Sequence, residues 1–211
     1  MENSNEPLMV TIRCITYNHA PYIRQCLDGI VIQKTNFRFE AIVHDDASTD
    51  STAAIIQEYA KKYPNIIKPI LETENQYSKH DGSLRQIMDE HTYGKYIAYC
   101  EGDDYWTDPL KLQKQVDFLE EHEEYGLVHT FFDFVDIDNR LVDPPSPFYQ
   151  QLRNRIYDGY IWDYYLVNPG FILTCTCCFR KSLYRSSENV FFDYGLFMMI
   201  ARQSKVYCLK E

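Results

Sequence analysis

Residues 96–106 read YIAYCEGDDYW, an apolar run that leads directly into Glu101, Asp103 and Asp104. A short run of this kind before a turn is typical of a buried strand. Three carboxylates within four residues repel one another, and their burial is costly unless a cation compensates. Oxygen ligands at this density suit Mg²⁺ or Mn²⁺ shared with a diphosphate. The alternative interpretation is a solvated acidic turn that caps the next helix.

Segments with strand and helix patterns alternate on both sides of this stretch. We expect strands at 8–16, 37–44, 65–71, 96–100, 127–137, 171–179 and 206–209, and helices at about 21–31, 52–63, 82–91, 109–121, 157–167 and 193–203. This order predicts an α/β fold with a mostly parallel central sheet flanked by helices. Ligands of such sheets bind outside the carboxyl ends of the strands. The polar clusters at 16–19, 45–50 and 101–104 are therefore expected to share one edge.

The composition restricts the partners and the compartment. A net charge of −10 argues against a nucleic-acid partner, which requires clustered Lys and Arg. Seven scattered cysteines without zinc-ligand spacing indicate reduced, buried thiols and a cytoplasmic location. The start of the chain does not resemble a secretory signal, and no uncharged apolar run approaches the roughly 20 residues of a membrane span.

The second polar cluster, DDASTD at 45–50, follows an expected strand. Ser48 or Asp50 is expected to cap the next helix, a function that does not require Asp45 or Asp46. Ionised carboxylates only accept hydrogen bonds, so these two can bind a base N–H or ribose hydroxyls. Thr16-Tyr17-Asn18 offers an aromatic face and an amide for a nucleobase, although packing is the alternative for the tyrosine. No Gly-rich nucleotide motif follows any strand, which argues against dinucleotide dehydrogenases and P-loop enzymes.

In order and placement, these motifs resemble the family 2 inverting glycosyltransferases with the GT-A fold. The matching text is VTI at 10–12 through TYN at 16–18, DDASTD at 45–50, and GKYIA at 94–98 leading into EGDD at 101–104. The resemblance implies a single GT-A domain over 1–211, with a nucleotide-sugar-binding half at about 8–108 and an acceptor half at about 109–211. The basic or histidine-bearing segment that often closes over the diphosphate has no clear match, which leaves a C-terminal truncation open.

The same resemblance implies roles for individual residues. Asp103 corresponds to the principal metal ligand of the family's Asp-x-Asp motif, with Glu101 and Asp104 as further metal candidates. Glu101 replaces the usual Asp, and its longer side chain leaves open whether it contacts the metal or only the ribose. The nucleotide-binding set is Thr16, Tyr17, Asn18, Asp45, Asp46, Glu101, Gly102 and Asp103.

On the acceptor side, the resemblance assigns the catalytic base to Asp193, at the start of a late helix. A carboxylate in a first helical turn is also favoured by the helix dipole alone, and this alternative stays open. Arg180 is a candidate for contact with phosphate, the alternative being a surface cation. Five aromatic residues could stack on a sugar, although packing in the protein is the favoured assignment for each. They are Tyr105, Trp106, Trp162, Tyr164 and Tyr165.

The implied activity is transfer of a sugar from a nucleotide diphosphate sugar to an acceptor hydroxyl with inversion, assisted by Mn²⁺ or Mg²⁺. By resemblance to the family, we expect UDP as the nucleotide and a glycan or lipid-linked acceptor. The resemblance also implies a function in surface polysaccharide assembly, and peripheral contact with the inner face of the membrane is left open. One alternative is a non-catalytic nucleotide- or carbohydrate-binding module. Another is a sugar-phosphate nucleotidyltransferase, which would ordinarily carry a Gly-rich, Arg/Lys-containing loop that residues 16–22 lack.

Overall fold

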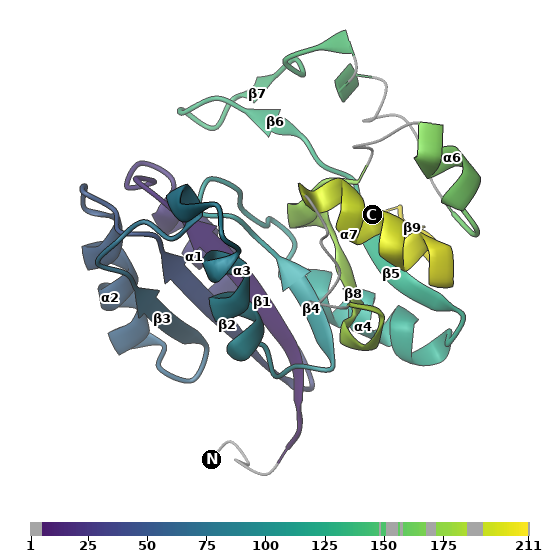
Figure 1. The fold of residues 1–211 in the computed structure, drawn as a ribbon, viewed down its shortest axis with the longest axis horizontal. Helices are drawn as coiled ribbons and strands as arrows, with labels where there is room; N and C mark the ends of the chain where they lie inside the picture. The colour runs from purple at the N-terminus through teal and green to yellow at the C-terminus, as the bar shows by residue number, and fades with distance from the viewer. Residues whose placement is uncertain are drawn as a thin grey trace.

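The computed structural model describes residues 6–147, 149–150, 156, 158–167, 172–184 and 192–210. Within this part the chain forms an α/β fold around a seven-stranded sheet (Figure 1). Its first elements are β1 (Leu8–Thr16), α1 (Ile23–Val31), β2 (Arg38–Asp45), α2 (Thr52–Lys62), β3 (Ile67–Leu71), the 3₁₀ helix η1 (Tyr77–Lys79), α3 (Ser83–Glu90), β4 (Tyr96–Tyr99) and α4 (Lys111–Glu121). The later elements are β5 (Tyr125–Thr130), β6 (Phe134–Val135), β7 (Leu141–Val142), α6 (Trp162–Val167), η2 (Thr174–Thr176), β8 (Cys178–Arg180), η3 (Lys181–Leu183), α7 (Phe192–Gln203) and β9 (Lys205–Leu209).

The sheet has the strand order β3-β2-β1-β4-β8-β5-β9. Neighbouring strands among β3, β2, β1 and β4 are parallel, and so are β5 and β9. Only β8 runs antiparallel to its neighbours β4 and β5. The expected mostly parallel sheet is therefore confirmed, and the register sets Thr16 at the end of β1 beside Asp45 at the end of β2.

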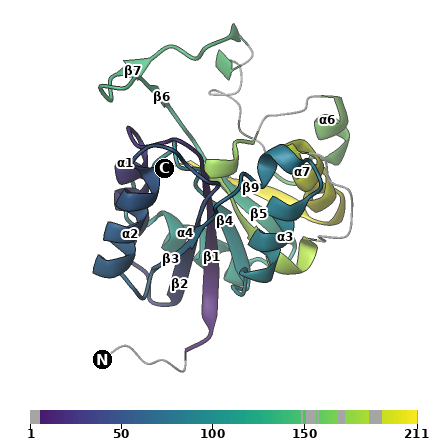
Figure 2. The ribbon, with the colours of Figure 1, turned by 60° about the vertical axis from the view of Figure 1, so that its left-hand side comes forward.

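Helices cover both faces of the sheet. Alternate side chains of each strand point to opposite sides, so apolar residues on both faces must be covered. Val10, Ile12 and Cys14 of β1 are fully buried in a cluster with apolar residues of α1, α2 and α4. A second cluster joins β4, β5 and β8 to α7 on the opposite side. Figure 2 shows α1 and α2 on one side of the sheet and α3 and α7 on the other. On the α3 side, buried Arg13 pairs with Asp89 at 2.7 Å.

Several expected elements differ from the structure. The helix expected at 157–167 begins at Trp162, and Gly159 instead forms an isolated β-bridge with Val206. The strand expected at 127–137 ends at Thr130, and β6 pairs instead with β7 in a separate hairpin that stands apart from the main sheet (Figure 1). In the segment expected as a strand at 171–179, only Cys178 and Phe179 are in a strand among the described residues. The Thr176 hydroxyl donates to the Leu173 carbonyl at 2.7 Å and stabilises a 3₁₀ turn instead. The helix expected from residue 109 begins at Lys111.

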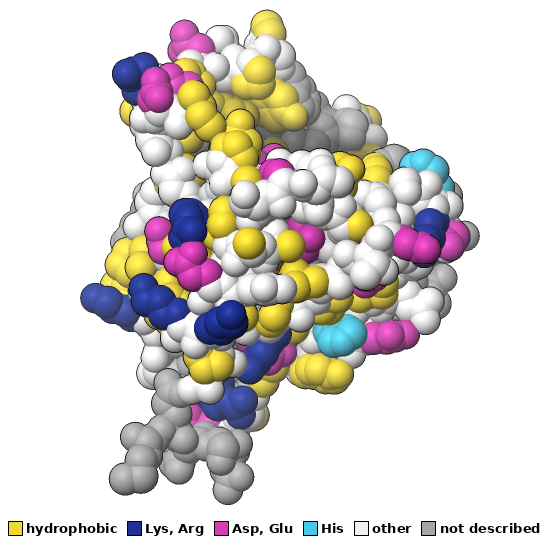
Figure 3. Space-filling view, turned by 90° about the vertical axis from the view of Figure 1, so that its left-hand side faces the viewer, with side chains coloured by type: hydrophobic (Ala, Val, Ile, Leu, Met, Phe, Trp, Pro, Cys, Tyr) yellow, Lys and Arg dark blue, Asp and Glu magenta, His cyan; other side chains and the backbone are white. Residues whose placement is uncertain are grey.

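Charge is unevenly distributed on the face shown in Figure 3, where most Lys and Arg side chains lie in the lower half of the view. The carboxyl ends of the parallel strands lie toward the top of Figure 1. An anion at that edge would therefore gain little from this group of cations. None of the helices that the structure describes is long and apolar enough to cross a membrane. The proposed division of the chain near residue 108 stays a prediction.

Candidate functional site

The carboxyl end of β1 is held from both sides by the two acidic loops. The amide of Asp46 donates to the Thr16 carbonyl at 2.9 Å, and the amide of Gly102 donates to the Ile15 carbonyl at 3.0 Å. Backbone hydrogen bonds therefore continue past the strands and fix where each loop begins. The structure brings the loops at 16–19, 45–50 and 101–104 to one edge of the sheet, as the sequence predicts.

The first two loops are joined by a hydrogen-bonded chain that runs through Ser48. The Ser48 hydroxyl donates to Asp45, and it accepts a hydrogen bond from the Asn18 amide at 2.8 Å. The Asn18 side-chain oxygen in turn accepts the Thr49 amide at 2.8 Å. Asn18 and Ala47 both have positive φ angles, of 55° and 63°. Left-handed backbone at non-glycine residues is costly and is often found at binding sites, so both loops have preformed shapes.

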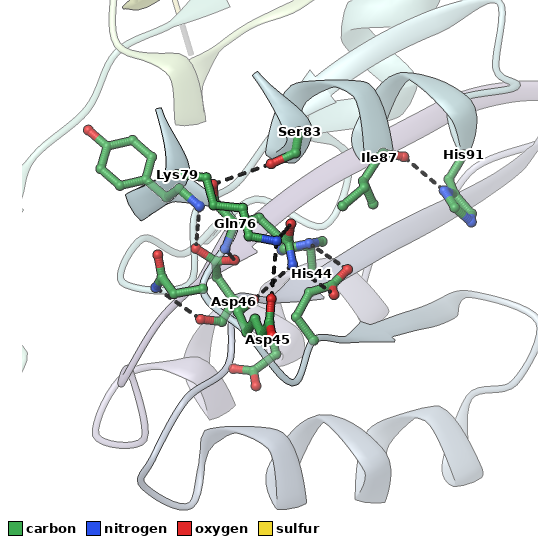
Figure 4. Close-up of polar contacts among 12 residues, drawn as sticks. His44, Asp45, Asp46, Gln76, Lys79, Ser83, Ile87 and His91 are labelled. Carbon is green, nitrogen blue, oxygen red and sulfur yellow. Dashed lines mark hydrogen bonds and ion pairs between the residues drawn. The ribbon is translucent and has the colours of Figure 1, made fainter. Parts of the chain in front are cut away.

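Asp46 is buried, and both of its carboxylate oxygens bind backbone amides of a distant loop (Figure 4). Oδ1 accepts the Gln76 amide at 2.7 Å and Oδ2 accepts the Tyr77 amide at 3.0 Å. The Asn75 side chain also donates to the Asp46 carbonyl at 3.1 Å. Asp46 therefore fixes the start of η1 beside the site, whereas its predicted contact with a nucleotide stays a prediction.

His44 lies directly beneath this network and is fully buried. Burial lowers the pKa of its imidazole, although the carboxylates of Asp45, Asp46 and Glu72 act in the opposite direction. The nearest of these contacts joins Nε2 to Glu72 Oε1 at 3.5 Å. The structure therefore places His44 in the core behind the nucleotide candidates.

The N-cap residue of α2 is Ser51, and the side-chain contact expected from Ser48 or Asp50 comes from Asp50, one residue earlier. Its Oδ1 accepts the Thr52 amide at 2.9 Å and the Thr52 hydroxyl at 2.5 Å, at the start of α2. Oδ2 accepts the Ala20 amide at 3.1 Å, which ties the cap to the loop after β1. Desolvation is the largest single effect on this exposed carboxyl and raises its pKa. The hydrogen bonds to Thr52 and Ala20 together outweigh desolvation, so the pKa is lowered overall.

The carboxylates after β4 differ in their exposure. The Asp103 side chain is 54% exposed, and its Oδ1 lies 4.0 Å from Nδ1 of His19. Asp104 is partly buried, and burial followed by the charge of Asp103 raises the pKa of its carboxyl. Glu101 is also partly buried. Asp103 is thus the carboxylate in this motif best exposed to reach a ligand.

The fit of a divalent ion can be judged from these donors. In the part of the chain that the structure describes, no group of three or more His, Cys, Asp or Glu side chains could hold a metal. Mg²⁺ typically binds one or two carboxylates and takes its other ligands from water and substrate phosphates. The exposed carboxylate of Asp103 fits an ion bound in that way and would not fit an ion enclosed by the protein.

The acceptor-side candidates are less completely described. Asp193 is the second residue of α7, and its side chain lies outside the described part of the structure, as does that of Tyr165. Trp106 is 5% exposed, its indole donates to the Cys175 carbonyl at 2.8 Å, and Lys111 lies over its ring. Trp106 therefore packs in the core and does not form a platform, whereas Tyr105, Trp162 and Tyr164 are partly buried.

Arg180 has a structural function that the sequence analysis did not predict. Its guanidinium donates to the Leu119 and His122 carbonyls at the end of α4 and to the Tyr125 carbonyl at 2.8 Å. Carbonyls at a helix end have no partner within the helix, so this arginine caps α4. The suggested contact with phosphate is therefore wrong, as is the alternative of a free surface cation.

The sequence analysis also missed a polar pocket of about 490 Å³ along α3. The described residues that line it are Asp81, Gly82, Arg85, Gln86, Asp89 and Glu90. The spacing of Arg85 and Asp89 by four residues, with Asp81 four residues before Arg85 and just ahead of the helix, could have indicated a shared polar face. Beside the pocket, the hydroxyl of Ser83 donates to the Gln76 carbonyl at 3.4 Å, and the Gln76 amide binds Asp46.

Comparison with known proteins gives one family match. The family model described as Glycosyl transferase family 2 matches residues 11–187. An uncharacterized protein of Mycobacterium tuberculosis is 49% identical over 115 residues, which are 54% of this chain and 32% of that protein. TuaG of Bacillus subtilis, whose name refers to teichuronic acid biosynthesis, is 33% identical over 54% of this chain and 42% of its own length. The matched segment thus spans about a third of the first of these relatives.

Solved structures share the fold at low sequence identity. Staphylococcus aureus TarS, in a complex with UDP, superposes with a TM-score of 0.66 at 20% identity, over 97% of this chain and 58% of that one. A mannosyltransferase of Pyrobaculum calidifontis, in a complex with GDP-Man and Mn²⁺, gives a TM-score of 0.65 at 21% identity, over 99% of this chain and 56% of that one. The predicted GT-A type of α/β fold is confirmed.

Proposed function

The chain belongs to glycosyl transferase family 2, and from this we propose that it transfers a sugar from a nucleotide diphosphate sugar to an acceptor hydroxyl, with inversion at the anomeric carbon. UDP is the favoured nucleotide, since TarS is a related protein solved with UDP and with UDP-GlcNAc. A glycan or lipid-linked acceptor in polysaccharide assembly is proposed because relatives such as TuaG have names from that field. We also propose a cytoplasmic location, with peripheral contact at the inner face of the membrane left open.

One observation carries this proposal, namely that β1 ends between the two acidic loops. The Asp46 and Gly102 amides bind carbonyls of two successive residues of β1. A nucleotide bound at this edge would have Thr16, Tyr17, Asn18 and Asp45 near its base and ribose. Its diphosphate would lie toward residues 101–104. This is the edge where ligands of parallel α/β sheets bind.

The residues of the nucleotide side would bind and orient the donor. Asp45 uses its carboxylate to accept from the Ser48 hydroxyl and amide, and an ionised carboxylate has further lone pairs for a base N–H or a ribose hydroxyl. Tyr17 is 45% exposed and could stack on the base. Because both loops are already held in shape, little conformational entropy would be lost on binding.

The residues of the acceptor side would carry out the proton transfer. Asp193 would remove the proton of the attacking hydroxyl, since an alcohol is a weak nucleophile at neutral pH. Asp103, with Glu101 or Asp104 as further candidates, would hold Mn²⁺ or Mg²⁺. When bound, that ion would supply Lewis-acid stabilisation of the departing diphosphate.

A thermal-shift panel followed by a product assay tests the proposal. The panel would contain UDP-glucose, UDP-GlcNAc and GDP-mannose, each with and without Mn²⁺, because a ligand that binds the native state raises its stability. A shift with one nucleotide sugar, followed by an NMR-detected product of inverted anomeric configuration, is the expected result. Metal-dependent binding without turnover on a broad set of acceptors would favour the non-catalytic module instead.

A further inference from the structure

His19 lies in the loop after β1 and faces the acidic motif after β4. Its Nδ1 is shielded from solvent and has no hydrogen-bond partner among the residues that the structure describes. The nearest carboxylate oxygen, Asp103 Oδ1, is 4.0 Å away. A charge-assisted hydrogen bond between these groups would be about 2.7–2.9 Å long. His19 Nδ1 and Asp103 Oδ1 are therefore too far apart to form a hydrogen bond with each other.

Gly102 allows this close approach of the two loops. A Cβ atom on residue 102 would lie 2.8 Å from His19 Nδ1 and 2.6 Å from Thr16 Cβ. The hydroxyl of Thr16 also lacks a partner in the described structure, although this side chain is only 1% exposed. Unsatisfied buried polar atoms are rare and require an explanation. Two of them therefore flank the same glycine, beside the exposed carboxylate of Asp103.

The separation of His19 and Asp103 is short enough for one metal ion to bind both side chains. Bonds to imidazole nitrogen and carboxylate oxygen are about 2.0–2.2 Å long, so two ligands of one ion lie at most about 4.3 Å apart. The observed 4.0 Å lies below this limit, at a separation that one ion spans only if the two ligands approach it from well-separated directions. Two protein ligands also agree with an ion that completes its coordination with diphosphate and water.

We propose that His19 is a second protein ligand of the divalent ion, through Nδ1 and together with Asp103. This inference rests on the proposed function, which supplies the ion. Imidazole nitrogen suits the later transition metals, whereas Mg²⁺ prefers oxygen. His19 therefore favours Mn²⁺ and especially Co²⁺ over Mg²⁺ at this site.

Pulsed electron paramagnetic resonance on the unmutated chain provides the first test. Mn²⁺ is added to the protein with UDP or with GDP, and the spin echo is examined for the modulation of a directly bound ¹⁴N nucleus. We expect this modulation, and we expect it to change when histidine is labelled with ¹⁵N. A bound Mn²⁺ without histidine nitrogen modulation overturns the assignment, and this readout does not depend on the folding of any variant.

Calorimetric metal titration of variants provides the second test. With UDP or GDP present, His19→Ala should bind Co²⁺ at least about ten-fold more weakly and Mg²⁺ with a smaller loss. His91→Ala is the matched control, because this exposed histidine binds only the Ile87 carbonyl of its own helix in the described structure. Equal Co²⁺ affinity in His19→Ala and the unmutated chain overturns the inference.

Asp103→Asn separates the two proposals. If this variant loses metal binding and His19→Ala keeps it, only the role of His19 is wrong. If the unmutated chain binds no Mn²⁺ with either nucleotide, the metal-assisted part of the proposed function fails as well.

Discussion

The main chain of Gly102 lies so close to Thr16 that a Cβ atom on residue 102 would be 2.4 Å from the Thr16 hydroxyl oxygen. Real Cβ atoms essentially never approach another heavy atom so closely, so a side chain at this position would force Thr16 at the end of β1, His19 in the loop after it, or residue 102 itself to shift. The site as proposed thus depends on a glycine between two acidic residues.

Gly102→Ala should therefore weaken nucleotide binding at least ten-fold and lower the free energy of unfolding by about 1–3 kcal/mol, the usual cost of overpacking. Urea denaturation and calorimetric titration with UDP and Mn²⁺ measure the two effects. Gly126→Ala is the matched control, because its Cβ would lie 2.1 Å from Ser204 Oγ, away from the site. It should lose stability and keep the affinity, and a parallel loss of affinity would contradict the prediction.

Ser48→Ala should weaken UDP binding, because the Ser48 hydroxyl connects the Asp45 carboxylate to the Asn18 amide. Ser48 is itself partly exposed, but loss of its hydroxyl removes a hydrogen bond from the buried Asp45 carboxylate, which costs about 1–3 kcal/mol shared between stability and binding. Ser78→Ala serves as control, since the Ser78 hydroxyl binds the nearby Asn75 carbonyl in an exposed loop. Unchanged UDP affinity in Ser48→Ala would show that the two loops keep their shape without this bridge.

Ala47→Gly should leave the free energy of unfolding unchanged or raise it by up to about 1 kcal/mol. At a φ of 63° an alanine pays a steric cost of roughly 1–2 kcal/mol that glycine does not, and this offsets the extra entropy of an unfolded glycine. Ala54→Gly, at an exposed position inside α2, should instead lose about 1 kcal/mol. Chemical denaturation of the two variants compares them directly, and equal losses would argue against strain at Ala47.

Sequence reasoning located the elements whose signals are local. The apolar run at 8–16 matches β1, and the runs before Asp45 and Glu101 match β2 and β4 within a residue or two. It failed where tertiary contacts decide the structure. Residues 131–137 have strand-like composition, but no neighbouring strand of the main sheet pairs with them, and β6 finds its partner in β7.

The candidate site was predicted to a similar extent. Strand order and loop polarity were enough to expect Asp45 and Asp103 at one edge of the sheet. The sequence could not show that Asp46 binds amides 30 and 31 positions away, or that Arg180 caps a helix 58 and 61 positions earlier. Contacts over such separations depend on the packed fold and leave no local pattern.

The pH dependence of stability should contain a contribution from His44. Burial lowers the pKa of this imidazole below 6.5, so the unfolded chain takes up a proton at a higher pH than the folded chain does. Stability is therefore lost as the pH falls below about 6.5, by up to 1.4 kcal/mol per pH unit until the folded pKa is reached. Urea unfolding of the unmutated chain and of His44→Gln between pH 7.5 and 5.5 isolates this contribution. Identical slopes in the two proteins would exclude it.

Asp193→Asn should abolish sugar transfer and leave donor binding intact, because the proposed base acts on the acceptor and does not contact the nucleotide. If Asp193 only stabilises the first turn of α7, the variant should lose about 0.3–1 kcal/mol of stability and keep its activity. Asp163→Asn, in the first turn of α6, shows what loss of such a helix-dipole contact does alone. Single-turnover assays with equal donor saturation separate the two roles, and transfer by Asp193→Asn at the rate of Asp163→Asn would remove Asp193 from the mechanism.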